Sequence, residues 1–425
     1  MQSSNVKSVS VVGLGYIGLP AAAMFASRKV KVVGIDVNQD AIDTINSGKI
    51  HIVEPELDLL VHAAVTEGYL RATTIPEPAD AFVIAVPTPF KKDYEPDLSY
   101  IRAATMSIAP VLKKGDVIIL ESTSPVGTTE QMIGWLAEAR PDLRFPTSSV
   151  ANPDVNVAYC PERVLPGHVV RELVQNDRII GGMTAACSQR AVEVYRVFVA
   201  GELLVTDART AEMSKLTENA FRDANIAFAN ELSFICDRLD INVWELIRLA
   251  NHHPRVNILQ PGPGVGGHCI AVDPWFIVHS APEAAKLIRQ ARETNNAKPR
   301  WVENKVVEAV RGFASRHSIE QTAVKIGFFG LAFKPNIDDL RESPSLDIVI
   351  TLAKEYRGQV TAVEPNITEL PSRLKDLGVK LHDVRTACEE CDVLVMLVDH
   401  SEFLEFKPDF RDDQILVDTK GIWLS

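Results

Sequence analysis

The chain has 425 residues, enough for two or three domains that each bury a core of their own. Its formal net charge of -12 lacks the basic footprint of nucleic-acid and anionic-membrane binders, so the sequence predicts neither partner. Six scattered cysteines favour a reducing compartment over a disulfide framework, and no long uninterrupted apolar stretch appears, so we expect a cytoplasmic protein outside the membrane.

The N-terminal stretch has the pattern of a dinucleotide-binding unit. A β-branched run leads into Gly13, Gly15 and Gly18 in G-x-G-x-x-G spacing, and an Ala-rich helical segment follows. A second strand, 31–35, ends at Asp36, where a carboxylate would bond the adenine ribose hydroxyls and repel a 2′-phosphate. The sequence therefore predicts a Rossmann-type sheet that binds NAD rather than NADP.

Further short hydrophobic strands are expected at 81–86, 116–120 and 155–159. Polar residues follow each of them, at the strand ends where doubly wound sheets bind ligands. Thr88, Thr123 and Thr129 are therefore candidate cofactor-loop residues, with plain turn formation as the alternative. Glu162 and Arg163 belong to the polar loop after the third of these strands.

Residues 210–239 contain neither Gly nor Pro and predict one long helix. Lys215, Asn219 and Arg222 are spaced to share one of its faces, among many apolar residues. A solvated stripe is the usual reading of such spacing, whereas this much apolar surface favours a lined cavity. The helix is also long enough to serve as a spine between domains and as a pairing surface for a second subunit.

One cysteine stands apart from the others. Cys269 follows four glycines within residues 262–267, and Asp273 comes four residues later. Such a backbone approaches a ligand closely, so the loop suggests a nucleophilic thiol; a buried structural cysteine is the alternative. Cys388 and Cys391 have C-x-x-C spacing without a second pair, so we predict no metal site.

Residues 282–313 predict one or two helices interrupted at Lys298–Pro299, the expected hinge before the last domain. Strands are then expected at 325–329, 359–364, 392–399 and 414–418. This second α/β unit lacks G-x-G-x-x-G and would hold something other than a dinucleotide, with Lys334, Arg341 and Lys420 as cations at strand ends. The predicted domains are 1–208, 209–300 and 301–425.

An NAD domain combined with a reactive cysteine allows a specific reaction. An aldehyde formed by one hydride transfer could be trapped as a thiohemiacetal, and a second transfer would give a thioester that water cleaves. Such a route needs a base, an oxyanion partner and an activated water. The sequence offers Cys269, Lys215, Asn219, Asp273 and Glu162 for these roles.

Five motifs, in order along nearly the whole chain, carry a family resemblance. They are residues 13–20, 121–128, 212–219, 266–269 with Asp273, and 329–334 with 341–344. Together they resemble the UDP-glucose/GDP-mannose 6-dehydrogenase family, and residues 252–269 and 159–167 resemble its N-acetylhexosamine branch. Members acting on UDP-glucose typically have Phe and Ser where this chain has Val265 and His268, which argues against glucose.

The resemblance implies a role for each matching residue. Cys269 would be the nucleophile, Lys215 the acid/base or oxyanion partner and Asp273 its assistant, with Glu162 and Thr123 near the hydrolytic water. The implied NAD contacts are Gly13, Gly15, Tyr16, Ile17, Gly18, Asp36, Thr88 and Thr129, with Arg341 near the pyrophosphate. The implied contacts to a UDP-N-acetylhexosamine are Arg163, Val164, Lys215, Asn219, Arg222, His253, Arg255, Gly266, Phe333, Lys334 and Lys420. The family also implies a homodimer built on the central helix.

The predicted fold is α/β: two Rossmann-like doubly wound parallel sheets joined by a helical central domain with a long spine helix. The predicted reaction is the four-electron oxidation of the sugar C6 hydroxyl to a carboxylate, with N-acetylmannosamine favoured and the gluco and galacto configurations left open. The rival readings are a two-electron dehydrogenase of the β-hydroxyacid type, which needs neither the cysteine nor the third domain, and a non-catalytic NAD-dependent sensor.

Overall fold

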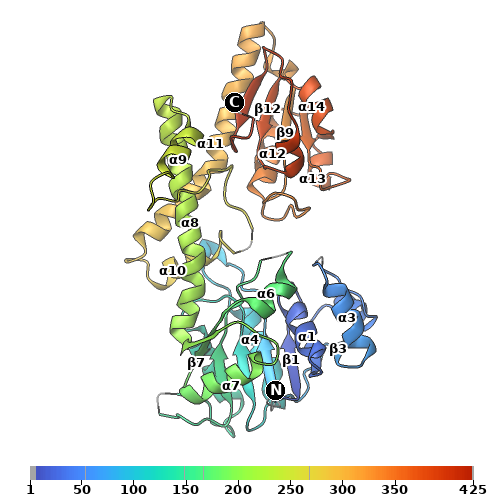
Figure 1. The fold of residues 1–425 in the computed structure, drawn as a ribbon, viewed down its shortest axis with the longest axis vertical. Helices are drawn as coiled ribbons and strands as arrows, with labels where there is room; N and C mark the ends of the chain where they lie inside the picture. Colours follow the sequence, from blue (N-terminus) through green and yellow to red (C-terminus); the bar gives the residue numbers. More distant parts are fainter. Residues whose placement is uncertain (1–5, 53, 148, 166, 268, 424–425) are drawn as a thin grey trace. The chain divides into compact units, whose positions relative to one another are not determined.

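A computed structural model describes residues 6–52, 54–147, 149–165, 167–267 and 269–423 (Figure 1). The chain divides into two compact units. Unit 1 comprises Met1–Glu218 and Trp275–Pro282, and unit 2 comprises Asn219–Pro274 and Glu283–Ser425. Within the described ranges, no helix has both the length and the apolar character that crossing a bilayer requires.

Unit 1 is built on a sheet in which, among the described residues, eight strands pair in the order β3-β2-β1-β4-β5-β6-β7-β8. The strands are β1 (Ser8–Val12), β2 (Lys31–Ile35), β3 (Leu70–Thr73), β4 (Ala81–Ile84), β5 (Val117–Leu120), β6 (Asn156–Tyr159), β7 (Arg178–Gly182) and β8 (Leu203–Asp207). Neighbours are parallel except β6 and β7, which are antiparallel. The start of β7 therefore lies at the same edge as the ends of β1, β4, β5 and β6.

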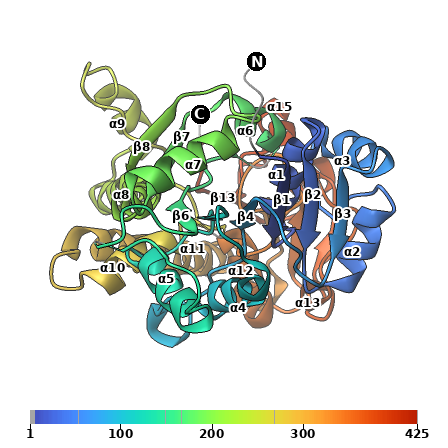
Figure 2. The same cartoon turned by 90° about the horizontal axis from the view of Figure 1, so that it is seen from below.

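Helices cover both faces of this sheet, and Figure 2 shows α1, α6 and α7 on one side and α4 and α5 on the other. The helices are α1 (Gly18–Ser27), α2 (Gln39–Asn46), α3 (Leu57–Thr66), α4 (Ser99–Ile108), α5 (Thr128–Ala139), α6 (Val169–Gln175) and α7 (Ala185–Tyr195), with the 3-10 turns η1 (Lys92–Tyr94) and η2 (Ala109–Val111). The central strands serve two cores because successive side chains point to opposite faces. In β5, Val117 and Ile119 pack into one core and Ile118 and Leu120 into the other.

The middle of the chain is helical, as predicted. The helices are α8 (Ala208–Leu239), α9 (Val243–Ala250), α10 (Asp273–Ser280) and α11 (Lys286–His317). Asn242 begins α9 by accepting the backbone N–H groups of Trp244 and Glu245. Figure 1 shows α8 as one unbroken helix.

The expected interruption at Lys298–Pro299 is wrong, because α11 runs through Pro299. A proline inside a helix removes one backbone hydrogen bond, at a cost of about 3 kcal/mol. Packing against α8 offsets that loss. Asn295 donates to the backbone oxygen of Asp223, and the Lys298 ammonium donates to the hydroxyl of Ser233.

Unit 2 contains the second sheet, whose described strands pair in the order β11-β10-β9-β12-β13, all parallel. The strands are β9 (Ile326–Phe329), β10 (Val360–Val363), β11 (Lys380–Leu381), β12 (Val393–Met396) and β13 (Ile415–Asp418). Besides α11, its helices are α12 (Pro344–Glu355), α13 (Ser372–Lys375), α14 (Val384–Glu390) and α15 (Ser401–Glu405), with the 3-10 turn η3 (Gln321–Ala323).

Both faces of this second sheet are covered as well. The core on one face includes residues of α11, α12 and α13, and the core on the other includes residues of α14 and α15. The order of its five strands matches the order of the first five in unit 1, with the first strand of the fold in the middle. The prediction of two doubly wound sheets with a long helix between them in the chain is confirmed.

Candidate active site

The glycine loop after β1 is shaped by backbone packing. Gly13 has φ +91°, and a Cβ on it would lie 2.5 Å from the oxygen of Ala85. A Cβ on Gly18 would lie 1.8 Å from the oxygen of Gly13, so α1 starts directly against the turn. Gly15 differs, because nothing lies within 4 Å of its Cβ position. The first and third glycines are needed for packing, and the second leaves room for a ligand at the start of a helix.

Asp36 stands at the end of β2, beside this loop. Its Oδ2 accepts the backbone N–H of Leu14 at 2.8 Å, and its Oδ1 accepts that of Asn38 at 2.9 Å. The side chain is only partly buried, so both oxygens keep lone pairs within reach of a ribose. At the end of β4, Thr88 Oγ1 is buried without a hydrogen-bond partner in the described part of the chain. These features fit NAD.

Thr129, another cofactor-loop candidate, is hydrogen-bonded within the protein. Its hydroxyl and its backbone N–H both donate to Glu212 Oε1, at 2.7 and 2.9 Å. Glu212 Oε2 accepts the N–H of Gly127 at 2.6 Å. A buried carboxylate from α8 thus satisfies the N-terminus of α5, although burial raises the pKa of Glu212. This contact also fixes the loop that carries Thr123, which is partly buried beyond the end of β5.

Glu162 is buried beyond the end of β6. Its Oε1 accepts the backbone N–H of Arg163 at 2.6 Å, and its Oε2 accepts a hydrogen bond from Arg178 at 2.5 Å. Its backbone oxygen accepts a hydrogen bond from Lys215 Nζ at 2.7 Å. Lys215 reaches this point from α8 and is partly buried. The candidate base for water and the candidate partner of the substrate hydroxyl are therefore adjacent in unit 1.

Asn219 and Asp273 form a second pair, within unit 2. Asn219 Nδ2 donates to Asp273 Oδ2 at 2.5 Å, and both side chains are buried. Asp273 begins α10 one turn after Cys269, and its backbone N–H donates to the Cys269 oxygen at 2.9 Å. Cys269 itself is exposed. The expected alternative of a buried structural cysteine is therefore wrong.

The glycines before Cys269 allow two loops of unit 2 to touch. A Cβ on Gly266 would lie 2.6 Å from the oxygen of Glu342 and 2.9 Å from Cβ of Phe333. The next residue, Gly267, has φ +82° and donates its N–H to the Glu342 oxygen at 3.2 Å. The loop before Cys269 is thus packed on the loop that carries Phe333. His268 lies outside the described residues.

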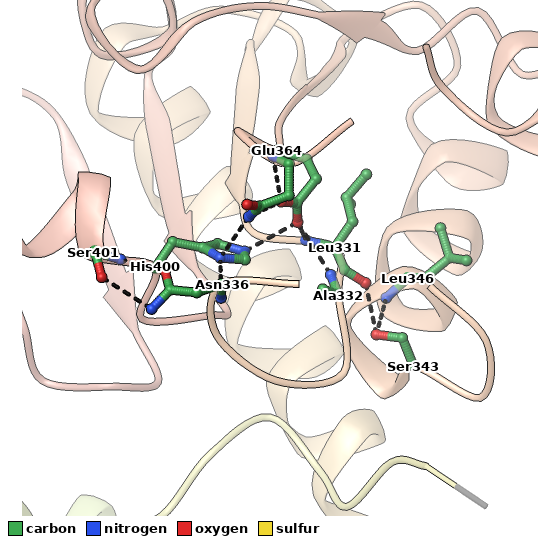
Figure 3. Close-up of polar contacts among 9 residues, drawn as sticks. Leu331, Ala332, Asn336, Ser343, Leu346, Glu364, His400 and Ser401 are labelled. Atoms are coloured by element: carbon green, nitrogen blue, oxygen red, sulfur yellow. Dashed lines mark hydrogen bonds and ion pairs between the residues drawn. The ribbon is translucent and has the colours of Figure 1, made fainter. Parts of the chain in front are cut away.

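Figure 3 shows the carboxylate that organises the loop after β9. Glu364 Oε2 accepts the N–H groups of Leu331 at 2.8 Å and Ala332 at 3.1 Å, and lies 3.1 Å from His400 Nε2. Because His400 Nδ1 accepts the N–H of Asn336 at 2.9 Å, the proton of the neutral ring sits on Nε2. Burial alone would raise the pKa of Glu364, but these hydrogen bonds lower it. The loop that carries Phe333 and Lys334 is pinned at both ends.

Both units have a carboxylate at the end of the second strand, but its surroundings differ. In each, a carboxylate after the second strand accepts a backbone N–H from the loop after the first: Asp36 from Leu14, and Glu364 from Leu331. Asp36 remains partly exposed, whereas Glu364 is 3% exposed and bonded to His400. A ribose could therefore be held at Asp36 but not at Glu364.

Other predicted substrate residues occupy varied settings. Lys420 Nζ lies 2.9 Å from Asp399 Oδ1, near the backbone of Gly262. Arg163 pairs with Glu218 at 2.9 Å. The remaining candidates are Val164, which is partly buried, and the exposed Arg222, His253 and Arg255. The predicted pyrophosphate contact, Arg341, is exposed and pairs with Asp339 through two nitrogens, at 2.7 and 2.9 Å.

Several residues that shape the site were not predicted from the sequence. Glu212, Glu364, His400 and Arg178 each hold a predicted residue or its loop in place through the hydrogen bonds described above. Glu212 lies within the 212–219 motif and could have been singled out there. Strand pairing or loop packing brings Glu364, His400 and Arg178 to their positions, and no local sequence pattern predicts such contacts.

Three consecutive parts of the chain match one protein family, UDP-glucose/GDP-mannose dehydrogenase. Its NAD binding domain matches residues 7–199, its central domain residues 209–297 and its UDP binding domain residues 327–424. The chain belongs to this family. It is thus an NAD-dependent nucleotide-sugar dehydrogenase, as predicted, and the fit of the β1 and β2 loops to NAD agrees with the match.

Individual relatives are similar along their full lengths. The chain is 62% identical to UDP-N-acetyl-D-mannosamine dehydrogenase of Yersinia pestis, over 98% of this chain and 99% of that one. It is 61% identical to an NDP-N-acetyl-D-galactosaminuronic acid dehydrogenase of Ralstonia nicotianae, over 98% and 96%. A solved structure of UDP-N-acetyl-mannosamine dehydrogenase from Staphylococcus aureus shares 43% identity with a TM-score of 0.82, covering 98% and 95%.

Proposed function

We propose that this protein oxidises the C6 hydroxyl of UDP-N-acetyl-D-mannosamine to the carboxylate. The observation that carries the proposal is the 62% identity, over 98% of the chain, to a relative with that activity in its name. The balanced reaction consumes the nucleotide sugar, one water and two NAD and yields the uronate, two NADH and protons. We further propose that the product serves the synthesis of bacterial surface polysaccharide.

Cys269 would carry the sugar between the two oxidations. Its thiolate adds to the C6 aldehyde, a C–S bond forms, and the resulting thiohemiacetal loses a second hydride to become a thioester. NAD, when bound, accepts one hydride in each oxidation. The exposure of Cys269, and its place on a loop packed against Phe333, support this role.

The remaining steps move protons. Lys215 would take the hydroxyl proton or hold the oxyanion, with Asn219 and Asp273 assisting from the next turn of α8 and from α10. Glu162 would accept a proton from the water that attacks the thioester, near Thr123. The hydrogen bonds that hold Glu162 and Lys215 beside one another support these assignments.

Each unit would hold one part of the ligands. In unit 1, Gly13, Gly15, Tyr16, Ile17, Gly18, Asp36, Thr88 and Thr129 would contact NAD, with Arg341 of unit 2 near the pyrophosphate. The proposed sugar-nucleotide contacts are Arg163, Val164, Lys215, Asn219, Arg222, His253, Arg255, Gly266, Phe333, Lys334 and Lys420. We retain the division into domains 1–208, 209–300 and 301–425 as part of the proposal. A cytoplasmic location is proposed from six cysteines that are all thiols.

The assay must distinguish the configuration of the substrate sugar, because the relatives with 62% and 61% identity are named for N-acetylmannosamine and N-acetylgalactosaminuronic acid respectively. We expect kcat/KM for NADH production with UDP-N-acetyl-D-mannosamine to exceed that with the gluco and galacto isomers by at least about tenfold. Two NADH per sugar and the product mass of the uronate would support the four-electron reaction. A faster galacto substrate would replace mannosamine, and one NADH per sugar would exclude the thioester route.

We also propose a homodimer built on α8. Phe221, Phe228 and Ile235 recur every seven residues, so they lie on one side of the helix, and all three are exposed. Leu239 and Ile241 extend the exposed apolar surface beyond them. A second copy of the same helix would bury these side chains.

A further inference from the structure

A buried cluster of charged and aromatic side chains lies behind Glu162. Arg178 Nη1 donates to Glu121 Oε1 at 2.7 Å, and its Nη2 donates to Glu162 Oε2 at 2.5 Å. The Tyr195 hydroxyl donates to the same oxygen of Glu121 at 2.5 Å. The guanidinium also lies 4.3 Å from the centre of the Tyr195 ring. All four side chains are buried, so this is no surface ion pair.

The antiparallel strand explains how the cluster forms. Glu121 and Glu162 follow β5 and β6, which are parallel neighbours, so both carboxylates lie at one edge of the sheet. β7 runs the other way, with Ala158 opposite Gly182 and Tyr159 opposite Gly181. Continuing that register places Arg178 opposite Glu162. The first residue of β7 therefore projects its charge between the two strand ends.

The charges of the cluster favour a fixed geometry. Burial disfavours the charge of Arg178, but Glu162, Tyr195 and Glu121 outweigh it and raise its pKa well above the ordinary value. Burial and the nearby Glu162 raise the pKa of Glu121 despite Arg178. A planar guanidinium that bridges two carboxylates restricts both of them to one orientation.

Within Glu162, it is the side-chain carboxylate that contacts this bridge. Its backbone oxygen holds Lys215, and the preceding strand, β6, pairs with β5. One carboxylate oxygen accepts the N–H of Arg163 and the other accepts a hydrogen bond from Arg178. Loss of the guanidinium would therefore remove one of these two contacts to the carboxylate and leave the Lys215 contact in place.

We propose that Arg178, braced by Glu121 and Tyr195, is a positioning residue that aims the Glu162 carboxylate at the water that cleaves the thioester. This inference rests on the proposed function. In the step concerned, water adds to the thioester carbonyl and Glu162 accepts the water's proton. The C–S bond then breaks, and Cys269 leaves as a thiolate. No electrons are transferred, so the two oxidations before it do not need Arg178.

The test is the variant Arg178→Met in the full-length enzyme, with NAD and UDP-N-acetyl-D-mannosamine. General-base catalysis contributes about 100-fold or more, so we expect kcat to fall by about that factor. Because the slowed step follows both oxidations and lets the thioester accumulate, KM should fall in parallel, and kcat/KM should change less than about threefold. A first-turnover burst of two NADH per site should persist. Intact-protein mass should show the sugar nucleotide attached through Cys269. Arg178→Lys keeps the charge but cannot bridge both carboxylates through two nitrogens. Its kcat and its adduct level should lie between those of the wild type and those of Arg178→Met.

The matched control is Asp116→Asn, because Asp116 is a buried carboxylate just before the opposite end of β5. It should leave kcat and the adduct level unchanged. If Arg178→Met does not fold, Tyr195→Phe removes one hydrogen bond to Glu121 and Glu121→Gln removes the negative charge that Arg178 contacts. Each should raise the adduct level to a smaller extent. Normal hydrolysis in the folded variants, or lost turnover without an adduct, overturns the inference. A wild-type enzyme that makes one NADH and no uronate overturns the proposed function instead.

Discussion

At the scale of single residues, the partners of a carboxylate decide its use. Asp36 and Glu364 occupy corresponding positions after β2 and β10, yet only Asp36 keeps an exposed surface for a ligand. Both carboxylate oxygens of Glu212 accept hydrogen bonds at the N-terminus of α5, and Glu162 accepts hydrogen bonds from Arg163 and Arg178. The residue type alone predicts a charge. The contacts of the side chain determine whether that charge is available to bind a ligand, to take part in catalysis or to stabilise a loop.

Selective alkylation tests the special status of Cys269. We expect iodoacetamide to modify Cys269 at least about tenfold faster than any other cysteine, because the other five are buried. Burial also raises the pKa of Cys391 to about 11 and of Cys388 to about 12, so these thiols stay protonated and unreactive. Peptide mass mapping against residual turnover measures the effect. Loss of turnover before Cys269 is labelled would contradict the prediction. So would a loss of NAD binding when the Cys269→Ser variant is treated with iodoacetamide.

At the scale of elements, α8 contributes to several parts of the site through successive turns. Glu212 fixes the loop before α5, Lys215 meets Glu162, and Asn219 meets Asp273. Further along, Asp223 pairs with Arg292 of α11, and both are buried. Within each unit, the helical repeat therefore sets the spacing of two such groups: Glu212 and Lys215 in unit 1, and Asn219 and Asp223 in unit 2.

The contact between α8 and α11 makes stability depend on pH through Lys298. Burial lowers the pKa of Lys298 to about 7, although its ammonium lies 3.8 Å from the centre of the Trp301 ring. The unfolded chain, with an ordinary lysine pKa, binds the proton more tightly, so Lys298 makes the free energy of unfolding rise between pH 7 and about 10.5. The slope is at most about 1.4 kcal/mol per pH unit.

The variant Lys298→Met removes this slope. We expect it to be more stable than the wild type near pH 7 by up to a few kcal/mol, with the difference shrinking as pH rises toward 10. Below pH 7 the difference should be constant. Urea unfolding at several pH values measures it, and Lys305→Met is the control, because Lys305 is a partly buried lysine of the same helix with a raised pKa. A difference that does not change with pH would exclude Lys298 as the cause.

At the scale of the whole molecule, two sheets with the same order of their first five strands serve different ligand chemistry. The unit 1 sheet continues beyond that shared order with β6, β7 and β8, and the reversal at β7 is the feature that unit 2 does not share among its described strands. The reversal brings Arg178 to the ligand edge. The added strands therefore supply a residue that the repeated fold lacks.

A charge on the exposed side of α8 tests the proposed dimer. We expect Phe228→Glu to shift the protein from dimer to monomer in light scattering, because a buried, unpaired carboxylate is costly at an interface. Leu404→Glu is the matched control, since Leu404 is exposed to a similar degree, 58% against 55% for Phe228, on α15. A Phe228→Glu variant that stays dimeric would place the interface elsewhere.

Features that depend on local pattern could be predicted from the residues alone. The glycines around Gly15, the acid at Asp36, the length of α8 and the loop before Cys269 all follow from periodicity, spacing and residue type within a few turns or strands. Five ordered motifs added the family and the reaction class. The interruption at Pro299 was predicted wrongly because local propensity omitted the packing of α11 on α8.

Which distant side chains meet depends on how the strands pair in the folded protein. Arg178 and Glu121 are 57 residues apart, and they touch because β7 pairs antiparallel with β6. Glu364 and His400 are 36 residues apart, and they meet because β10 and β12 flank β9. Strand direction and neighbour choice arise from packing over the whole sheet, so no window of sequence contains them.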